Sequence, residues 1–268
     1  MKLILNLLKA SHLAPTLAVT LISFLLASSL WWEGPAFVIA FGIFLGQLLV
    51  GFTNDLYDYQ DDLEHNRVNK PLVAATISSR QLINAIKIIT PIAIVVNLAG
   101  PLGINGGLIY LLGVAFGISY NFYFKFTLLS PLPYALAFAA LVSCIVVATD
   151  RTPPLWLVLS ASCLGVAAHF ANVIKDLNAD LKSNIIGLPQ RLGKRVSKLI
   201  ITLLLLGTTL LLNATNPNLS LLVVGVIGVI LTAISPDRFI FKALIITVVV
   251  DLILLLNTAD AKIGSIVI

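Results

Sequence analysis

The chain has 268 residues, of which 59% are hydrophobic and only 11% are charged, and its mean hydropathy is +1.02. This charged fraction is too low for the surface of a soluble protein and for a disordered chain. The composition therefore indicates an integral membrane protein. Both cysteines, Cys144 and Cys163, lie in apolar runs, which favours neither a disulfide framework nor a cysteine-based metal site.

Nine apolar runs follow one another, most of them close to the roughly 20 residues that a helix needs to cross about 30 Å of hydrocarbon. Turns rich in glycine and proline separate the runs, and no long linker suggests a second domain. The runs are His12 to Trp32, Gly34 to Thr53, Leu82 to Gly100, Gly106 to Phe124, Pro131 to Ala148, Leu155 to Ile174, Leu199 to Leu212, Leu219 to Ile234 and Phe239 to Leu256. The sequence therefore predicts an all-α bundle of nine transmembrane helices in a single domain over residues 1–268. The first run is long enough to span and more spans follow it, so we expect it to be retained and not cleaved as a signal peptide.

The basic residues divide unequally between the two sides of the predicted membrane. Fifteen of the 17 lysines and arginines fall on one side, and only Arg151 and Lys262 fall on the other. Because basic residues concentrate on the cytoplasmic side, we expect the N-terminus inside and the C-terminus outside. The net charge of +5 is then topogenic and suited to anionic membrane lipids, and it does not indicate a nucleic-acid partner.

An acidic cluster follows the second apolar run, in the sequence NDLYDYQDDLEHNRVNKPL from Asn54 to Leu72. Five of the chain's twelve acidic residues lie within ten positions there: Asp55, Asp58, Asp61, Asp62 and Glu64. Ionised side chains beside hydrocarbon are costly and repel one another, so this cluster calls for a cation.

A second polar stretch, Ala168 to Lys194, repeats the spacing of the first. Five positions correspond at a constant separation of 118 residues: Phe52, Asn54, Asp58, Asp62 and Pro71 match Phe170, Asn172, Asp176, Asp180 and Pro189. An internal duplication explains this spacing, and both motifs, at 54–62 and 172–180, end an even-numbered span and so lie at the same depth. Equivalent elements of repeat-built membrane proteins commonly converge on one site.

Helical geometry places each motif on one face, because residues four and eight apart lie above one another. Asn54, Asp58 and Asp62 form one polar stripe, with Asp55 adjacent, and the motif at 172–180 forms the other. Oxygen ligands without a His or Cys pattern indicate Mg²⁺, which completes its shell with water and substrate phosphate.

Basic residues interleave with the acids and are suited to phosphate oxygens. Arg67 and Lys70 follow the first motif, Lys125 ends the fourth span, and Lys182 follows Asp180. Acids, metal and bases together indicate a diphosphate site, and the apolar spans behind it suit a hydrocarbon chain. The sequence lacks a GxxxxGK[ST] loop, which counts against an ATPase.

These residues resemble the UbiA superfamily of intramembrane prenyltransferases over the whole chain, in a bacterial, actinobacterial-type branch. NDLYDYQDD is similar to the NDxxDxxxD motif of the family. Asp176 and Asp180 are similar to its second motif, DxxxD. The segment from Tyr120 to Lys125 is similar to its Tyr-to-Lys element. From this bacterial-type resemblance we expect the membrane to be a bacterial inner membrane. The sequence departs from the family pattern at Lys70, which replaces the usual arginine, and at Ile186, where many relatives have a basic residue.

The resemblance implies Mg²⁺-dependent transfer of an isoprenyl group from its diphosphate to an aromatic or other lipophilic acceptor. Two Mg²⁺ ions would be held by Asn54, Asp55, Asp58, Asp62, Asp176 and Asp180. The diphosphate would be bound by Asn54, Arg67, Lys70, Lys125, Lys182 and Asn172, and Asp58, Asp176, Lys125 and Tyr120 would take part in catalysis. Chain length, acceptor and oligomeric state are left open.

Several polar residues have more than one interpretation. Asp61 points about 100° away from the metal stripe, which favours a solvated or salt-bridging residue. His169 and Gln47 lie one heptad before Asp176 and Asn54, where each could orient a ligand or hydrogen-bond within the bundle. Asp251 lies alone in the ninth span without an evident partner, and we leave it out of the site.

Two other functions fit parts of the sequence. A membrane terpene cyclase would use the same ionisation but would need no acceptor. A secondary transporter would also contain repeats and intramembrane charges, but it usually concentrates them near the middle of the bilayer. The acids here cluster at span ends beside basic loops, which favours the enzyme.

Overall fold

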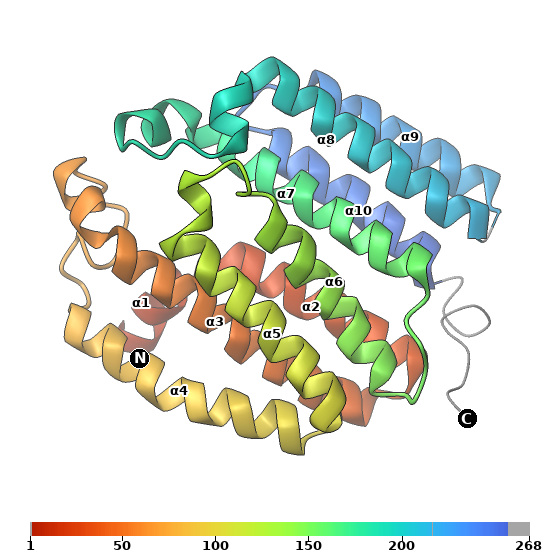
Figure 1. The fold of residues 1–268 in the computed structure, drawn as a ribbon, viewed down its shortest axis with the longest axis horizontal. Coiled ribbons are helices and arrows are strands. Elements are labelled where there is room, and N and C mark those ends of the chain that lie inside the picture. The colour runs from red at the N-terminus through yellow and green to blue at the C-terminus, as the bar shows by residue number, and fades with distance from the viewer. Residues whose placement is uncertain (1, 216, 257–268) are drawn as a thin grey trace.

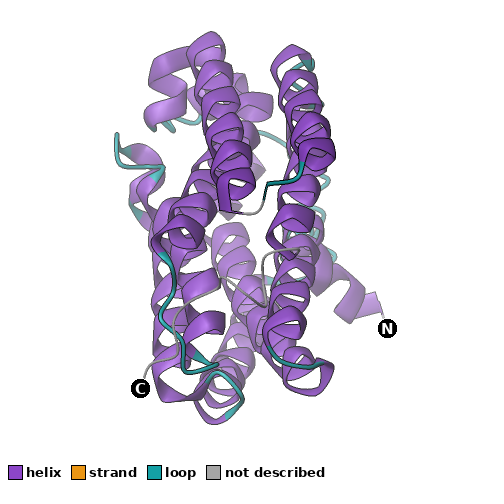
Figure 2. Ribbon diagram, turned by 90° about the vertical axis from the view of Figure 1, so that its right-hand side faces the viewer, coloured by secondary structure: helices purple, strands orange, loops and turns teal. Residues whose placement is uncertain are grey.

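The computed structural model describes residues 2–215 and 217–256, and this part of the chain is a bundle of helices without a strand (Figure 2). The helices are α1 (Lys2–Ala10), α2 (Leu13–Leu30), α3 (Glu33–Glu64), α4 (Ser79–Ala99), α5 (Gly103–Phe122), the short 3-10 helix η1 (Phe124–Phe126), α6 (Leu132–Val147), α7 (Leu155–Lys182), α8 (Leu188–Thr215), α9 (Leu219–Ile234) and α10 (Ile240–Leu256). The predicted all-α fold is confirmed.

Each of the nine predicted runs forms a helix, from α2 to α10, and α1 adds a short helix before them. Within the described ranges, α2, α3, α4, α5, α7 and α8 are long and apolar enough to cross a membrane, whereas α6 and α9 are apolar but have 16 residues each. Pro131 stands directly before α6, and Pro217 and Pro236 lie in the turns on either side of α9, where proline is tolerated. Lys262 lies outside the described residues.

The helices are arranged so that the end of the bundle meets its beginning. Neighbours in the chain pack side by side, α3 also contacts α5, and α10 contacts α2, α7 and α8 (Figure 1). One apolar cluster joins α2, α3, α5, α6 and α7, and another joins α7 to α10. The two long helices α3 and α7 thus run through the buried part of the molecule and carry the acidic motifs at their ends.

Small residues let the helices approach closely. The Tyr110 hydroxyl of α5 donates a hydrogen bond of 2.7 Å to the backbone carbonyl of Ile43 in α3. A Cβ added at Gly46, one turn further along α3, would lie only 2.2 Å from the Tyr110 oxygen. Glycine at this position therefore fixes the spacing of α3 and α5.

An ion-pair cluster ties α8 to the turn between α9 and α10. The Nζ atoms of Lys194 and Lys198 each lie 2.9 Å from a carboxylate oxygen of Asp237. Hydrogen bonds from these two ammonium groups hold the pKa of Asp237 below its usual value.

Candidate functional site

The acidic motifs lie at the C-terminal ends of α3 and α7, and both helices end at the same end of the bundle (Figure 1). α3 continues without a break to Glu64, so Asn54, Asp58 and Asp62 share a helical face as their spacing predicts. α7 likewise continues to Lys182 and carries the second motif on its last turns.

Two acids of the first motif are buried and paired with the bases that follow them in the chain. The Lys70 ammonium lies 2.5 Å from Asp55 Oδ1, and the Arg67 guanidinium lies 3.0 Å from Asp62 Oδ1. The two aspartate side chains are each only 2% exposed. Lys70 also lies 3.8 Å from Asp62, so the segment after α3 folds back over its own helix end.

The third acid–base pair joins segments far apart in the sequence. Lys125 lies in η1, directly after α5, and its ammonium donates a hydrogen bond to Asp58 Oδ1. The Lys125 side chain is 5% exposed and that of Asp58 18%. The ammonium also lies 4.7 Å from the ring centroid of Tyr57, so a cation–π contact contributes to its position.

The second motif is less enclosed than the first. Asp180 is half-buried and accepts a hydrogen bond of 2.9 Å from Gln190 Nε2. The Asp176 side chain is 58% exposed and lies 3.8 Å from the Lys175 ammonium. Within the described chain, the half-buried Asn172 and the exposed Lys182 form no side-chain hydrogen bond or ion pair. Of the predicted residues of this motif, Asp180 lies within electrostatic range of Arg67 and Lys125, whereas Asp176 and Lys182 are exposed.

Ser183, directly after α7, bridges the two motifs. Its hydroxyl donates to Asp61 Oδ2 over 2.9 Å and lies 3.5 Å from the Arg67 guanidinium. Asp61 is therefore an ion-pair and hydrogen-bond partner of the loop, as its position off the stripe predicts. Asp180 also lies within electrostatic range of Arg67 and Lys125, so the bases of the first half face an acid of the second.

Three rings from three helices pack together beside the ion pairs. Tyr120 of α5 lies 5.0 Å from Tyr134 of α6 and 5.4 Å from His169 of α7, measured between ring centroids. Tyr120 is also within electrostatic range of Asp58 and Asp180. His169 Nε2 lies 3.2 Å from the Ser130 hydroxyl, which supports the interpretation of His169 as a hydrogen-bonding residue of the bundle.

His12 is a residue of the site that no sequence motif indicates. It sits in the turn between α1 and α2, and its Nε2 lies 3.4 Å from both Asp55 Oδ1 and Asn54 Nδ2. A Cβ added at Gly51 would lie 2.6 Å from backbone atoms of Ser11, so this glycine lets the turn rest directly on α3. The only signal for this contact in the sequence is a histidine beside an otherwise apolar run.

The donor set fits a hard divalent cation bound partly through other oxygens. Asp55, Asp58, Asp62 and Asp180 supply carboxylate oxygens, and Asp55 Oδ2 is buried without a hydrogen-bond partner. Among the described residues, no three His, Cys, Asp or Glu side chains are grouped closely enough to form a ready cage. Mg²⁺ suits such a site because it commonly takes one or two carboxylates and fills its shell with water and phosphate.

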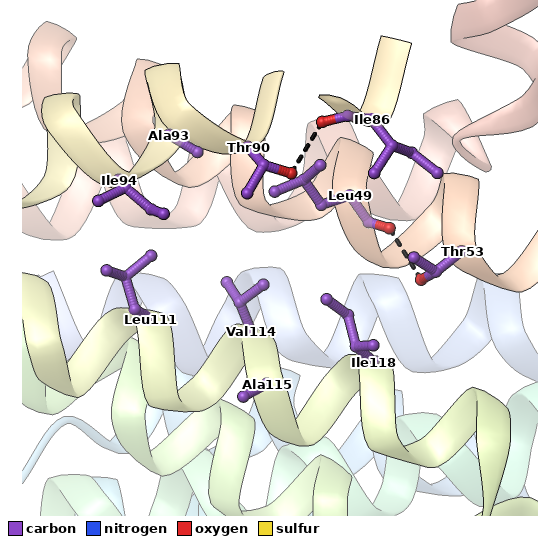
Figure 3. Close-up of a pocket in the computed structure, with 10 residues that line it drawn as sticks. All are labelled: Leu49, Thr53, Ile86, Thr90, Ala93, Ile94, Leu111, Val114, Ala115 and Ile118. Atoms are coloured by element: carbon purple, nitrogen blue, oxygen red, sulfur yellow. Dashed lines mark hydrogen bonds between the residues drawn. The ribbon is translucent and has the colours of Figure 1, made fainter. Parts of the chain in front are cut away.

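A separate apolar groove of about 260 Å³ lies between α3, α4 and α5 (Figure 3). Leu49 and Thr53 of α3 line it together with residues of the two facing helices. The hydroxyls of Thr53 and Thr90 donate to carbonyls of their own helices, so the lining offers no free polar group. The groove therefore suits hydrocarbon, and its lining contains none of the acids and bases of the ion pairs.

The fold and the site define a membrane-embedded helical bundle in which two carboxylate-bearing helix ends meet a cluster of bases. The model of the UbiA prenyltransferase family matches residues 15–242. The chain belongs to this family and is an intramembrane prenyltransferase.

Solved structures of low sequence identity share the fold. A digeranylgeranylglyceryl phosphate synthase is 17% identical, with a TM-score of 0.69 over 97% of this chain and 99% of the other. A UbiA homologue from Archaeoglobus fulgidus bound to GPP and Mg²⁺ is 15% identical, with a TM-score of 0.68 over 92% and 96% of the two chains. An apo UbiA homologue from Aeropyrum pernix K1 is 16% identical, with a TM-score of 0.70 over 89% and 94%. A search of curated protein sequences found no match.

Proposed function

We propose that this protein transfers an isoprenyl group from an isoprenyl diphosphate to an aromatic or other lipophilic acceptor within the membrane, with Mg²⁺ as cofactor. The observation that carries the proposal is the set of three acid–base pairs at the junction of the two motifs: Asp55 with Lys70, Asp58 with Lys125, and Asp62 with Arg67. Each pair combines a ligand for a divalent cation with a ligand for diphosphate. The Archaeoglobus fulgidus homologue bound to GPP and Mg²⁺ supports this combination.

The basic residues act on the leaving group. When the allylic C–O bond breaks, its electron pair stays on the diphosphate oxygen and the hydrocarbon becomes an allylic cation. Arg67, Lys70 and Lys125 neutralise the charge that develops on the diphosphate, from side chains that are 28%, 20% and 5% exposed. Lys182 and the two motif asparagines, Asn54 and Asn172, add further contacts to the diphosphate.

The metal residues are those of the two acidic stripes: Asn54, Asp55, Asp58, Asp62, Asp176 and Asp180. Bound Mg²⁺ supplies Lewis-acid stabilisation of the leaving diphosphate. We propose two ions, as the resemblance to the family implies, and the carboxylates that would hold them come from two helix ends.

We assign to the ring of Tyr120 the role of stabilising the allylic cation. It lies within electrostatic range of both Asp58 and Asp180, and aromatic faces attract cations. The nucleophile of the acceptor then captures the cation, and the acceptor's proton leaves.

The site lies on the cytoplasmic side in our proposal, with the N-terminus inside, the C-terminus outside, and the protein in a bacterial inner membrane. The common location of the two motifs and their basic segments at one end of the bundle supports this orientation (Figure 1). Residues 1–268 then act as one domain built from two related halves, each of which carries one acidic motif at the end of a long helix.

The test is incubation of the purified protein with isoprenyl diphosphates of several lengths and Mg²⁺, with and without phenolic and quinone-precursor acceptors. We expect mass spectrometry to detect prenylated acceptor and released diphosphate, and we expect Asp58→Ala and Asp176→Ala to abolish the release. A cyclised hydrocarbon formed without an acceptor would identify a terpene cyclase instead. Retained turnover in both variants would refute the metal site.

A further inference from the structure

Gln190 is a buried polar residue that belongs to neither acidic motif. It lies in the first turn of α8, its side chain is buried, and its Nε2 donates a hydrogen bond of 2.9 Å to Asp180 Oδ2. Its Oε1 is buried without a partner. A buried amide with half of its hydrogen-bonding capacity unused is costly, so packing or function must hold it in place.

The start of α8 is fixed against the segment that carries Lys125. The backbone N–H of Leu188 donates to the Ser130 hydroxyl over 3.0 Å, and His169 contacts the same hydroxyl from α7. A Cβ added at Gly187 would lie 2.9 Å from both the Lys125 carbonyl and Gln190 Oε1. Gly187 therefore packs closely against both the Lys125 backbone and the Gln190 side chain, with no room for a larger residue.

This arrangement links the two motifs through a second route besides Ser183. Asp58 is paired with Lys125, the Lys125 segment holds the start of α8, and Gln190 of α8 holds Asp180. The hydrogen bond from Gln190 occupies one oxygen of Asp180 and leaves the other free for a cation. Side chains that orient a metal ligand in this way typically change metal affinity by about 10–100-fold when they are replaced.

We propose that Gln190 is a positioning residue for prenyl transfer, which orients the Asp180 carboxylate and thereby sets the affinity of the site for Mg²⁺. This role rests on the proposed function, since it requires Asp180 to be a metal ligand. Gln190 itself touches neither the diphosphate nor the metal.

The test compares Gln190→Leu and Gln190→Met, which keep the side-chain size but cannot donate, with Ser197→Ala as a matched control. Ser197 is a buried polar residue of the same helix whose hydroxyl, among the described residues, bonds only to the Pro189 carbonyl. We expect both Gln190 variants to weaken Mg²⁺ binding by about 10-fold or more in calorimetric titrations with inorganic diphosphate present. We expect Ser197→Ala to bind Mg²⁺ like the wild type.

Turnover as a function of Mg²⁺ concentration separates positioning from a general structural defect. We expect the Gln190 variants to reach near-wild-type kcat at saturating Mg²⁺, with the loss confined to the concentration required. A lower kcat at every concentration, or unchanged Mg²⁺ affinity in both variants, overturns the proposal. Asp180→Asn distinguishes a failure of the Gln190 proposal from a failure of the proposed metal site. If Asp180→Asn also leaves Mg²⁺ binding unchanged, the proposed metal site itself is wrong.

Discussion

Replacing Lys125 with methionine distinguishes metal binding from diphosphate binding at the site. Lys125 neutralises Asp58 in the ligand-free protein. Both side chains are largely buried, and removing one partner of a buried pair commonly costs about 3–5 kcal/mol. Asp58 keeps some contact with solvent, so we take the lower end, about 3 kcal/mol. We therefore expect Lys125→Met to be less stable than the wild type in the absence of metal.

The same change should strengthen binding of Mg²⁺ alone. In the wild type, Mg²⁺ must displace the ammonium from Asp58 and leave a buried cation without a partner. Lys125→Met removes this competition, and about 3 kcal/mol corresponds to roughly 100-fold in affinity at 1.4 kcal/mol for each factor of ten. Diphosphate binding should weaken at the same time, because the phosphate oxygens lose a cation.

The assay is thermal unfolding in detergent with increasing Mg²⁺ and no diphosphate, since a ligand that binds the folded state raises the Tm with concentration. We expect a larger Mg²⁺-dependent rise in Tm for Lys125→Met than for the wild type. Lys182→Met is the control, because it removes the same charge from an exposed side chain without an ion pair in the described chain. Equal responses of the wild type and Lys125→Met to Mg²⁺ would refute the idea that the pair competes with the metal.

Three further changes test other parts of the structure. Gly51→Ala should destabilise the protein by about 1–3 kcal/mol because its Cβ would lie 2.6 Å from the backbone of the α1–α2 turn, whereas Gly207→Ala, with open space around it, should be neutral or stabilising in the same denaturation measurement. Asp61→Asn should retain most of the wild-type rate of diphosphate release, because Asp61 bonds to Ser183 after α7 and does not lie on the metal stripe. A loss of rate as large as that of Asp58→Ala would contradict this assignment. Asp237→Asn should lower stability at neutral pH but not at low pH: the folded pKa of Asp237 lies below its unfolded value near 3.8, so its contribution is present above that value and is lost as the pH falls through the folded pKa. A stability difference that stays constant between pH 7 and pH 2 would contradict this reasoning.

The parts of the site that the sequence predicts are those governed by helical periodicity. The spacing of Asn54, Asp58 and Asp62 requires only that α3 continues past the apolar run, and it continues to Glu64. The order of the spans likewise follows from apolar length and turn residues. Local regularities of this kind are readable from a single sequence because they depend on neighbours in the chain.

The side-chain contacts that the sequence does not predict are those that depend on tertiary packing. Lys125 is 67 residues from its partner Asp58, and His12 is 43 residues from Asp55. Gln190 and Ser183 belong to neither acidic motif, and they reach the acids because α8 starts against the Lys125 segment and α7 ends beside the loop after α3. Sequence spacing contains no information on these approaches.

Asp176 is the predicted residue whose position differs most from its expected role. It lies one helical turn before Asp180, yet its side chain is mostly exposed and is paired with Lys175, whereas Asp180 is held by Gln190. If Asp176 engages the metal only together with diphosphate, then Asp176→Ala should bind Mg²⁺ alone like the wild type but should lose the added affinity for Mg²⁺ that inorganic diphosphate provides. Asp180→Ala should weaken Mg²⁺ binding under both conditions, because its carboxylate is already oriented in the ligand-free protein. Calorimetric titrations of both variants with and without diphosphate measure this difference, and identical behaviour of the two would mean that the exposure of Asp176 has no bearing on the order in which the site assembles.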